Sequence, residues 1–253
     1  MIKEKVFGLP KYRHAVPGLI CPGCGHGIAG RLIVDVIDEL GIADNVIHVF
    51  GIGCGGYASF TFKLDAAVCS HGTAPAVATG IKRALYGRPI VFTYQGDGDA
   101  IAIGAGALIN AAARGEKITV IMGNNANYGT TGGQLAPTTL LGQKTTTTPS
   151  GRDKELHGFP IHTAEMLVPI EGVVYSARGA VNNPANYQRT KKYVKAAFQK
   201  QIDNEGFTFV EILVACPTDW HLTPVESLKW MEEKMIPEFP LGEFKNISQK
   251  KPS

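Results

Sequence analysis

The sequence lacks a long hydrophobic run and has little net charge. Its longest apolar, uncharged stretch covers residues 100–113, whereas a membrane-spanning helix needs about 20 residues. The 25 Lys and Arg against 22 Asp and Glu leave a formal net charge of +3, which does not favour a nucleic-acid partner. Residues 1–14 carry charges but no apolar segment of a secretory signal. We therefore expect a soluble, cytoplasmic protein that neither enters a membrane nor binds nucleic acid.

The sequence also lacks an even number of cysteines: it has five. Without an export signal, an odd number argues against a disulfide framework and points to metal ligation, redox chemistry or simple burial. Glycine, by contrast, is abundant: it accounts for 30 of 253 residues, well above the usual share of about 7%. This density indicates several places where the backbone turns sharply or approaches a ligand closely.

Short apolar runs rich in β-branched residues alternate with helical patterns along the chain. The strand-like runs cover residues 46–49, 89–94, 118–122, 172–176 and 207–214, and the helical patterns cover residues 26–40, 75–85, 100–114 and 184–204. Such alternation is typical of an α/β fold with a mostly parallel sheet and helices on both faces. We expect one domain over residues 1–253, in which residues 1–15 and 238–253 are surface arms.

Polar residues follow two of the predicted strands. The segment GDGDA begins at the end of one strand, and Asn125 follows the next strand. Because ligands bind at the carboxyl ends of parallel strands, we expect these residues to lie together. The two glycines allow backbone to approach a phosphate, and Asp97 and Asn125 are oxygen ligands suited to Mg²⁺. The alternative is an ordinary turn in which Asp97 caps a helix. A dinucleotide fingerprint is excluded, because Ile101 stands where the third glycine would be.

Four cysteines form a candidate ligand set, and two of them, Cys54 and Cys216, follow predicted strands at the same edge. Cys21 and Cys24 form CPGCGHG at a helix start, Cys54 lies in GIGCGG, and Cys216 lies in ACPTDW. Four thiolates suit a zinc ion or an iron–sulfur cluster, and ligand type alone does not decide between them. The other interpretation is that Cys54 and Cys216 are simply buried and that the CxxC pair is incidental. Cys69 falls outside this set, and we expect a small buried residue there.

The spacing from GDG to the double asparagine resembles the thiamine-diphosphate enzymes. The ordered series CPGCGHG, GIGC, HGTAPAVATGIK, GDGDAIAIG, NNANYGTTGGQ and CPT resembles the β subunit of the 2-oxoacid:ferredoxin oxidoreductases. The resemblance covers about residues 21–237 and is strongest to the short β subunits assigned to 2-oxoglutarate or 2-oxoisovalerate. It implies the thiamine-diphosphate-binding fold, with this chain as the diphosphate-binding domain.

The resemblance also implies site residues. The Mg²⁺ ligands are the side chains of Asp97 and Asn125 and the carbonyl of Asn127. The [4Fe–4S] ligands are Cys21, Cys24, Cys54 and Cys216. The residues expected to bind thiamine diphosphate are Cys54, Gly55, His71, Gly72, Gly96, Asp97, Gly98, Asp99, Asn125, Asn127, Tyr128, Gly129, Thr130 and Thr131. His71 is expected to contact the cofactor, and no catalytic base is assigned on this chain.

The reaction implied by the resemblance is oxidative decarboxylation of a 2-oxoacid with coenzyme A to acyl-CoA and CO₂. The substrate would be 2-oxoglutarate, 2-oxoisovalerate or pyruvate, and the electrons would leave through the [4Fe–4S] cluster to ferredoxin. The glutamate that activates thiamine diphosphate in related enzymes has no matching motif here. The resemblance therefore implies an α subunit that carries the pyrimidine-binding domain and this glutamate, and it allows γ and ferredoxin-like δ subunits. We predict that this chain alone is inactive.

Three residues depart from the usual family pattern. Thr73 stands where family members have the arginine of HGRA, and Asn127 and Thr130 stand where a large apolar residue is common. Two other functions stay open: a non-redox thiamine-diphosphate decarboxylase or synthase subunit, and a non-catalytic iron–sulfur electron-transfer subunit. His26 is expected either to cap its helix or to hydrogen-bond near the cluster. The basic stretch 189–200 is expected to be a solvated helix face, with docking of an acidic electron carrier as the alternative.

Overall fold

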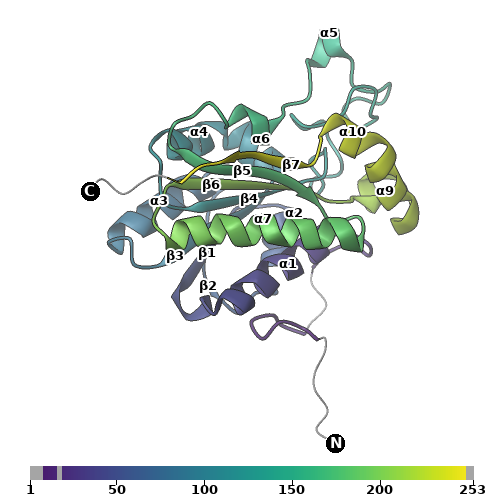
Figure 1. Cartoon of the computed structure of the whole chain (residues 1–253). Helices are drawn as coiled ribbons and strands as arrows, with labels where there is room; N and C mark the ends of the chain where they lie inside the picture. The colour runs from purple at the N-terminus through teal and green to yellow at the C-terminus, as the bar shows by residue number, and fades with distance from the viewer. Residues whose placement is uncertain (1–7, 16–18, 249–253) are drawn as a thin grey trace, which may run out of the picture.

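The computed structural model describes residues 8–15 and 19–248, and its centre is a seven-stranded sheet (Figure 1). The strands are β1 (Val46–Phe50), β2 (Asp65–Val68), β3 (Ile90–Gly96), β4 (Thr119–Asn124), β5 (Val173–Ala180), β6 (Phe207–Leu213) and β7 (Gly242–Asn246). They lie in the order β2-β1-β3-β4-β6-β5-β7. Neighbouring strands run parallel except β7, which is antiparallel to β5.

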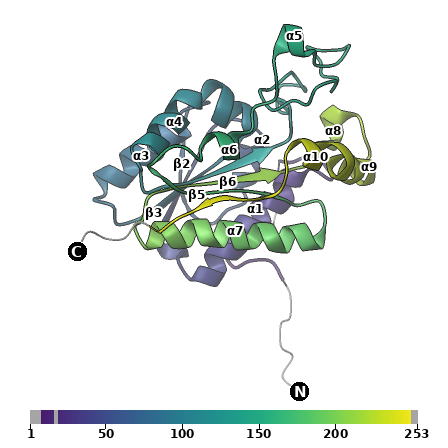
Figure 2. The same ribbon diagram turned by 45° about the horizontal axis from the view of Figure 1, so that its top comes forward.

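Helices cover both faces of the sheet (Figures 1 and 2). One face carries α1 (Gly25–Leu40), α2 (Cys54–Ser59) and α7 (Pro184–Ile202), and the other carries α3 (Ala74–Ala84), α4 (Ala105–Ala113) and α6 (Thr163–Met166). The short helices are η1 (Ala43–Asn45), η2 (Gly98–Ile103), α5 (Lys154–His157), α8 (Pro217–Trp220), α9 (Pro224–Trp230), η3 (Met231–Met235) and α10 (Ile236–Glu238). The expected α/β fold with a mostly parallel sheet is confirmed.

Each face of the sheet has its own apolar layer, because successive strand residues point to opposite faces. Phe92 packs edge to face against Phe198 of α7, with ring centroids 5.4 Å apart. The neighbouring residue Val91 belongs to the other layer, together with Leu108 of α4. All four side chains are fully buried. The sheet is therefore a rigid base whose strand ends can hold site residues in fixed positions.

Two strands are present that the sequence pattern does not predict. β2 is a four-residue edge strand whose sequence, DAAV, has too few large apolar residues to signal a strand. β7 pairs with β5, where Tyr175 lies opposite Asn246. The expectation that residues 238–253 form a surface arm is therefore wrong for residues 242–246. This partly polar strand covers the edge of β5, which would otherwise present unpaired backbone groups.

The helix expected over residues 100–114 is interrupted. Its first part is η2, which has wide π-helical turns, and the regular helix α4 starts only after Gly104. A side chain at Gly104 would collide with the carbonyl of Asp99 and approach the carbonyl of Gly72 to 2.9 Å. The widened turns thus let the segment after β3 pack against the loop that contains Gly72. Wide turns of this kind are frequent at functional sites.

The described part of the N-terminal segment lies along the body of the domain. The His14 N–H donates to the Thr61 carbonyl at 2.8 Å, and Arg31 donates to the Gly8 carbonyl at 2.6 Å. The rest of the two expected arms, residues 1–7 and 249–253, lies outside the described residues. The boundaries of a single domain over the whole chain stay a prediction. Within the described ranges, no helix is both long and apolar enough to cross a membrane.

After β1 the chain continues toward one edge of the sheet, and after β3 it continues toward the other edge. β2 lies beyond β1 at one end of the sheet, whereas β4 lies on the other side of β3. The loops that follow β1 and β3 consequently diverge at the carboxyl ends of these strands and leave a crevice between them. Open α/β sheets bind ligands in such a crevice. The candidate site lies at this point.

Candidate functional site

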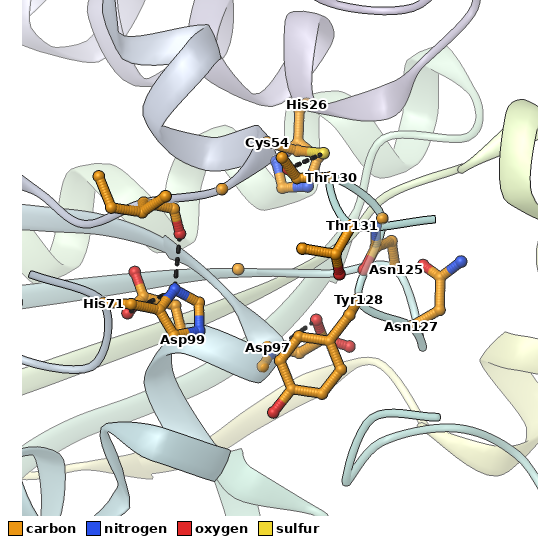
Figure 3. Close-up of a pocket in the computed structure, with 15 residues that line it drawn as sticks. His26, Cys54, His71, Asp97, Asp99, Asn125, Asn127, Tyr128, Thr130 and Thr131 are labelled. Atoms are coloured by element: carbon orange, nitrogen blue, oxygen red, sulfur yellow. Dashed lines mark hydrogen bonds and ion pairs between the residues drawn. The ribbon is translucent and has the colours of Figure 1, made fainter. Parts of the chain in front are cut away.

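One pocket lies at this crevice and is lined by the segments that follow β1, β3 and β4 (Figure 3). Its walls are His26, Ile52, Gly53, Cys54, His71, Gly96, Asp97, Gly98, Asp99, Asn125, Asn127, Tyr128, Gly129, Thr130 and Thr131. Figure 3 shows His71 and Asp99 on one side, Asn125 and Asn127 on the other, and Asp97 between them. We call this the oxygen pocket. The structure thus gathers most of the residues that the sequence analysis selected.

Three oxygen atoms converge in the oxygen pocket. The amide oxygen of Asn125 lies 3.2 Å from Asp97 Oδ1 and 2.7 Å from the carbonyl oxygen of Asn127. A half turn of the amide would place its nitrogen there instead, where it donates to both oxygens. In the first orientation, the oxygen separations match those of adjacent ligands around an octahedral Mg²⁺, about 3.0 Å for bonds of about 2.1 Å. The donor set therefore fits a magnesium ion.

Asp97 is almost completely buried, and this burial raises its pKa to about 7. The neighbouring Glu211 carboxylate also contributes to this increase. Two hydrogen bonds act in the opposite direction: the Gly98 N–H donates to Oδ1 at 2.8 Å, and the Thr138 hydroxyl donates to Oδ2. A cation beside Asp97 would also favour the ionised carboxylate. Thr138 carries no signal in the sequence, because it lies in a long polar loop without periodicity.

Two glycines of the oxygen pocket lie against neighbouring side chains, with no space for a Cβ at Gly98 and a crowded position at Gly129. The Tyr128 ring lies against Gly98, and any Cβ at this position would collide with it. At Gly129, a Cβ would lie 3.1 Å from Asn125 Nδ2 and 3.3 Å from Cys54 Sγ. Both positions therefore let a ligand approach the backbone closely.

His71 and Asp99 are held by the backbone around them. His71 Nδ1 lies 2.8 Å from the Ile52 carbonyl oxygen and 3.7 Å from Asp99 Oδ1. If Nδ1 carries the proton and donates to Ile52, Nε2 is left for a ligand. Asp99 accepts a hydrogen bond from the Gly72 N–H, and burial raises its pKa. Asp99 consequently ties the loop that carries His71 to the start of η2.

Gly55 and Gly72 stand behind the pocket wall. A Cβ at Gly55 would lie 3.2 Å from the backbone carbon of Gln95, and one at Gly72 would lie 2.9 Å from the Gly104 nitrogen. Gly72 also has a positive φ of +83°, which other residues rarely adopt. These two glycines allow close packing of backbone segments, which is an indirect contribution to the pocket.

A second cavity borders the oxygen pocket. It is lined by Leu19, Ile20, Cys21, Cys24, Cys54, Tyr57, Gly129, Thr130, Gly132, Cys216, Pro217, Thr218 and Asp219. All four cysteines that the sequence analysis grouped together therefore line one cavity, which we call the thiol cavity. Cys69 lies apart from it, is half-buried and has its Sγ 3.5 Å from the Phe50 carbonyl oxygen.

Close backbone packing brings the distant cysteines together. Cys24 immediately precedes α1, and Cys216 follows β6. Between them, the Gly25 N–H donates to the Ala215 carbonyl at 2.9 Å. A Cβ at Gly25 would lie only 2.6 Å from the Ala215 nitrogen, so glycine is needed for this approach. The CPGCG sequence thus combines two thiols with the glycine that seats them beside β6.

Three thiols that line this cavity, those of Cys24, Cys54 and Cys216, have raised pKa values and are protonated at neutral pH. Burial raises the pKa of Cys24 to about 12 and also raises the pKa values of Cys54 and Cys216. The Cys216 thiol donates to Asp219 Oδ2 at 3.2 Å. Thiolates would form here only when positive charge enters the cavity. In the part of the chain that the structure describes, no three His, Cys, Asp or Glu side chains lie close enough to hold one metal ion. The cluster assignment stays a prediction.

His26 lies inside the first turn of α1 and is buried. Its Nδ1 lies 2.7 Å from the Tyr94 hydroxyl, and burial lowers its pKa to about 4, so the ring is neutral. The residue at the cap position is Cys24, and no side chain caps the helix. The expectation that His26 caps its helix is therefore wrong. A role beside a cluster stays a prediction.

Comparison with protein families matches residues 53–212 to the thiamine pyrophosphate enzyme C-terminal TPP-binding domain. Ketoisovalerate oxidoreductase subunit VorA of Methanothermobacter marburgensis is 42% identical over 228 residues, which cover 90% of this chain and 48% of that protein. 2-Oxoglutarate synthase subunit KorB of Archaeoglobus fulgidus is 34% identical over 218 residues, which cover 86% of this chain and 77% of that protein. The chain thus spans about half the length of the VorA relatives.

A solved structure agrees with these sequence relationships. The 2-oxoglutarate:ferredoxin oxidoreductase from Magnetococcus marinus, with 2-oxoglutarate, coenzyme A and succinyl-CoA bound, matches with a TM-score of 0.78 and 25% identity. The match covers 98% of this chain and 88% of that chain. Family model, relatives and fold thus confirm the resemblance seen in the sequence motifs. The chain belongs to the thiamine pyrophosphate enzymes and, among them, to the subunits of the 2-oxoacid:ferredoxin oxidoreductases.

Proposed function

We propose that the chain binds thiamine diphosphate with Mg²⁺ in the oxygen pocket and a [4Fe–4S] cluster in the thiol cavity. It would act as the β part of a 2-oxoacid:ferredoxin oxidoreductase. The assembled enzyme would convert a 2-oxoacid and coenzyme A to acyl-CoA and CO₂ and would transfer the electrons to ferredoxin. An α part with the activating glutamate would complete the site, and γ and δ subunits would complete the electron path.

The observation that carries this proposal is the wall shared by the two cavities. Cys54, Gly129 and Thr130 line both of them, and Cys54 Sγ lies 3.0 Å from Thr130 Oγ1. A group bound to Cys54 would therefore lie beside a cofactor in the oxygen pocket. An oxidative reaction needs such a neighbour to accept electrons one at a time, whereas a non-redox decarboxylase does not.

The residues of the oxygen pocket have distinct parts in this function. Asp97, Asn125 and the Asn127 carbonyl would hold Mg²⁺, and the ion would hold the diphosphate. The hydroxyls of Thr130 and Thr131 are hydrogen-bond donors on the same wall. When bound, thiamine diphosphate supplies the carbon nucleophile and the electron sink that decarboxylation of a 2-oxoacid requires. The protein's own contribution is to bind and orient this group.

The thiol cavity supplies the number of cysteines that a [4Fe–4S] cluster needs. Its four thiols surround the cavity wall, and a four-iron cluster is held by four cysteine thiolates. Because Cys24 and Cys216 are buried, the positive charge of the iron would offset the cost of forming their thiolates. Asp219 lies 3.2 Å from Cys216 Sγ and adds negative charge beside the proposed cluster. Such neighbouring charge is one of the factors that set a cluster's reduction potential.

Among 2-oxoacids, the pocket favours a substrate with a single carboxylate, such as ketoisovalerate. No Lys or Arg stands among the described residues that line it. Thr73, at the position of the usual family arginine, donates its hydroxyl to the Ser70 carbonyl at 2.7 Å. This wall therefore offers no fixed cation for the second carboxylate of 2-oxoglutarate. The relatives are named for both oxoacids.

Exposed apolar side chains near the pocket support a covering partner. Ile52 is 53% exposed and Ile103 is 66% exposed, and both follow the strand ends that form the site. Apolar residues grouped at a site are typical of subunit contacts. The α part is the partner that this proposal requires, since it would bring the missing glutamate to the cofactor.

The proposal is tested on anaerobically purified chain and on its complex with partner subunits. The chain should contain about four iron and four acid-labile sulfide and should bind thiamine diphosphate only with Mg²⁺. The complex should reduce methyl viologen when both ketoisovalerate and coenzyme A are present, and 2-oxoglutarate should be a poorer substrate. Zinc in place of iron would favour a non-redox enzyme. Iron without thiamine diphosphate binding would favour an electron-transfer subunit, and turnover by the isolated chain would contradict the need for a partner.

A further inference from the structure

A completely buried ion pair lies in the sheet beside the oxygen pocket. Arg178 of β5 and Glu211 of β6 are paired across the two strands, and both side chains are 0% exposed. The Arg178 Nε lies 2.9 Å from Glu211 Oε2. The Arg178 guanidinium also binds Glu165 of α6. Buried ion pairs contribute little to stability, because removing two charges from water costs about as much as their attraction returns. A buried pair in the sheet therefore calls for a second role.

The second oxygen of Glu211 contacts Asn124, the residue that precedes the candidate ligand Asn125. Asn124 Nδ2 donates to Glu211 Oε1 at 2.7 Å, and Asn124 Oδ1 accepts from the Ala126 N–H at 2.9 Å. Ala126 has a positive φ of +57°, a conformation that costs alanine about 1 kcal/mol or more. The Asn124 side chain thus holds the strained residue that separates Asn125 from Asn127.

The rest of this turn is also held by the protein. Trp220 Nε1 donates to the Asn125 carbonyl at 3.1 Å, and the Thr139 hydroxyl donates to the Ala126 carbonyl at 2.7 Å. These bonds occupy two consecutive carbonyls of the turn. The Asn125 side chain contacts both Asp97 Oδ1 and the Asn127 carbonyl. The contacts of Asn124 therefore determine which groups the turn presents to a metal ion.

We propose that Glu211 and Asn124 are positioning residues for the Mg²⁺ ligands, with Arg178 as the cation that is paired with Glu211. Glu211 fixes the orientation of the Asn124 amide, because a carboxylate only accepts and so selects the nitrogen. The amide oxygen is then directed to Ala126, and the turn stays in the conformation that brings Asn125 and Asn127 to Asp97. This inference rests on the proposed function, because it assumes that Mg²⁺ and thiamine diphosphate bind in the oxygen pocket.

The test compares Glu211→Gln with Glu165→Gln in the full-length chain. Both variants remove a carboxylate from Arg178, but only Glu211 contacts Asn124. The quantity measured, by calorimetry, is the Mg²⁺ concentration at which thiamine diphosphate binding reaches half-saturation. We expect about a tenfold increase for Glu211→Gln and less than a twofold change for Glu165→Gln. Trp220 fluorescence should report the displaced turn, since its indole bonds the Asn125 carbonyl.

A second variant, Asn124→Ala, keeps the buried ion pair and covers the case in which Glu211→Gln does not fold. It should show the same increase of about tenfold. The double variant should be no worse than Asn124→Ala, because Glu211 acts through Asn124, whereas independent effects on stability would add. A wild-type chain that binds no thiamine diphosphate would overturn the proposed function. Wild-type binding with equal Mg²⁺ requirements in Glu211→Gln and Glu165→Gln would overturn this inference alone.

Discussion

The oxygen pocket and the thiol cavity share a wall but are built in different ways. In the oxygen pocket, the main polar side chains have protein partners: Asp97 has Thr138 and Gly98, and Asp99 has Gly72. In the thiol cavity, Cys54 is hydrogen-bonded to Thr130 and Cys216 to Asp219, and the backbone of His26 bonds to Cys24. Hydrogen bonds to its side chains hold the oxygen pocket in shape, whereas the thiol cavity is held mainly by packing of the backbone.

This difference follows from the chemistry of the two sets of ligands. Carboxylate and amide oxygens accept hydrogen bonds strongly, so neighbouring N–H and O–H groups can arrange them before a metal binds. Thiols form weak hydrogen bonds, and burial keeps those of Cys24 and Cys216 protonated. We infer that folding arranges the oxygen pocket, whereas ligand binding completes the thiol cavity. Substitutions should therefore separate the two sites.

The largest effect is expected for Asp97→Ala. This change removes the one carboxylate among the three candidate Mg²⁺ ligands. Thiamine diphosphate binding in the presence of Mg²⁺ should weaken at least about 100-fold, or about 2.7 kcal/mol, by calorimetry. The iron content should stay unchanged. Asp65→Ala, at an exposed position of β2, is the control. Normal cofactor binding by Asp97→Ala would refute the ligand assignment.

The complementary change is Cys216→Ser. A serine hydroxyl is a poor ligand for iron, so the purified chain should lose most of its iron and its visible absorbance. Thiamine diphosphate should still bind within about threefold of the wild-type affinity, because the oxygen pocket is held by its own contacts. Cys69→Ser makes the same substitution outside the thiol cavity and should keep the iron. Equal iron loss in both variants would show that the cavity does not define the cluster site.

The sequence predicts the buried parts of the fold well, because they depend on local patterns. β3, β4 and β6 are apolar runs between turn residues, and α7 has Asn183 as its cap, with the side chain accepting from the Asn186 N–H at 2.8 Å. The edge strands β2 and β7 are missed, since they pair through backbone atoms and bury few apolar side chains. Their existence depends on the neighbouring strand and is not encoded in their own composition.

The same limit applies to the candidate site. Residues that occur in motifs, such as Asp97 and Cys54, can be found from the sequence. Residues that act on them through side-chain contacts cannot, because Thr138 and Glu211 are distant along the chain and carry no motif. His26 illustrates a partial signal: its position near a helix start suggests a cap, but its Tyr94 contact depends on the packing of α1 on β3. Tertiary contacts of this kind require the structure.

Acid should lower the stability of the domain that carries both sites, because two of its histidines are buried. Burial lowers the pKa of His26 to about 4 and that of His48 to about 3, below the ordinary value of 6.5. The unfolded chain therefore binds protons that the folded chain excludes, and stability falls as the pH drops below about 6.5. At pH 5 each histidine should cost about 2 kcal/mol of unfolding free energy.

The variant His48→Phe tests this pH dependence. His48 is stacked between Phe50 and Phe92, with ring centroids 5.1 and 4.5 Å away. A phenyl ring therefore suits this aromatic environment. Urea unfolding at pH 7.5 and pH 5 measures the loss of unfolding free energy between the two pH values. The part of this loss that comes from the two histidines should be about half as large in the variant as in the wild type, because only His26 remains. The same substitution at the exposed His14 should leave the loss unchanged. An undiminished loss in His48→Phe would refute the assignment.

The smallest effect is expected for Thr138→Val, which tests how far the oxygen pocket is arranged by its own hydrogen bonds. The Thr138 hydroxyl donates to Asp97 Oδ2 and favours the ionised carboxylate that Mg²⁺ requires. One such bond contributes about 1 kcal/mol, so the Mg²⁺ requirement at pH 7 should increase about fivefold. The increase should be smaller at pH 8.5, where Asp97 is ionised in both proteins. Thr163→Val removes a buried hydroxyl that has no partner among the described residues and should change neither value. An equal effect at both pH values would mean that Thr138 acts on the shape of the pocket and not on the charge of Asp97.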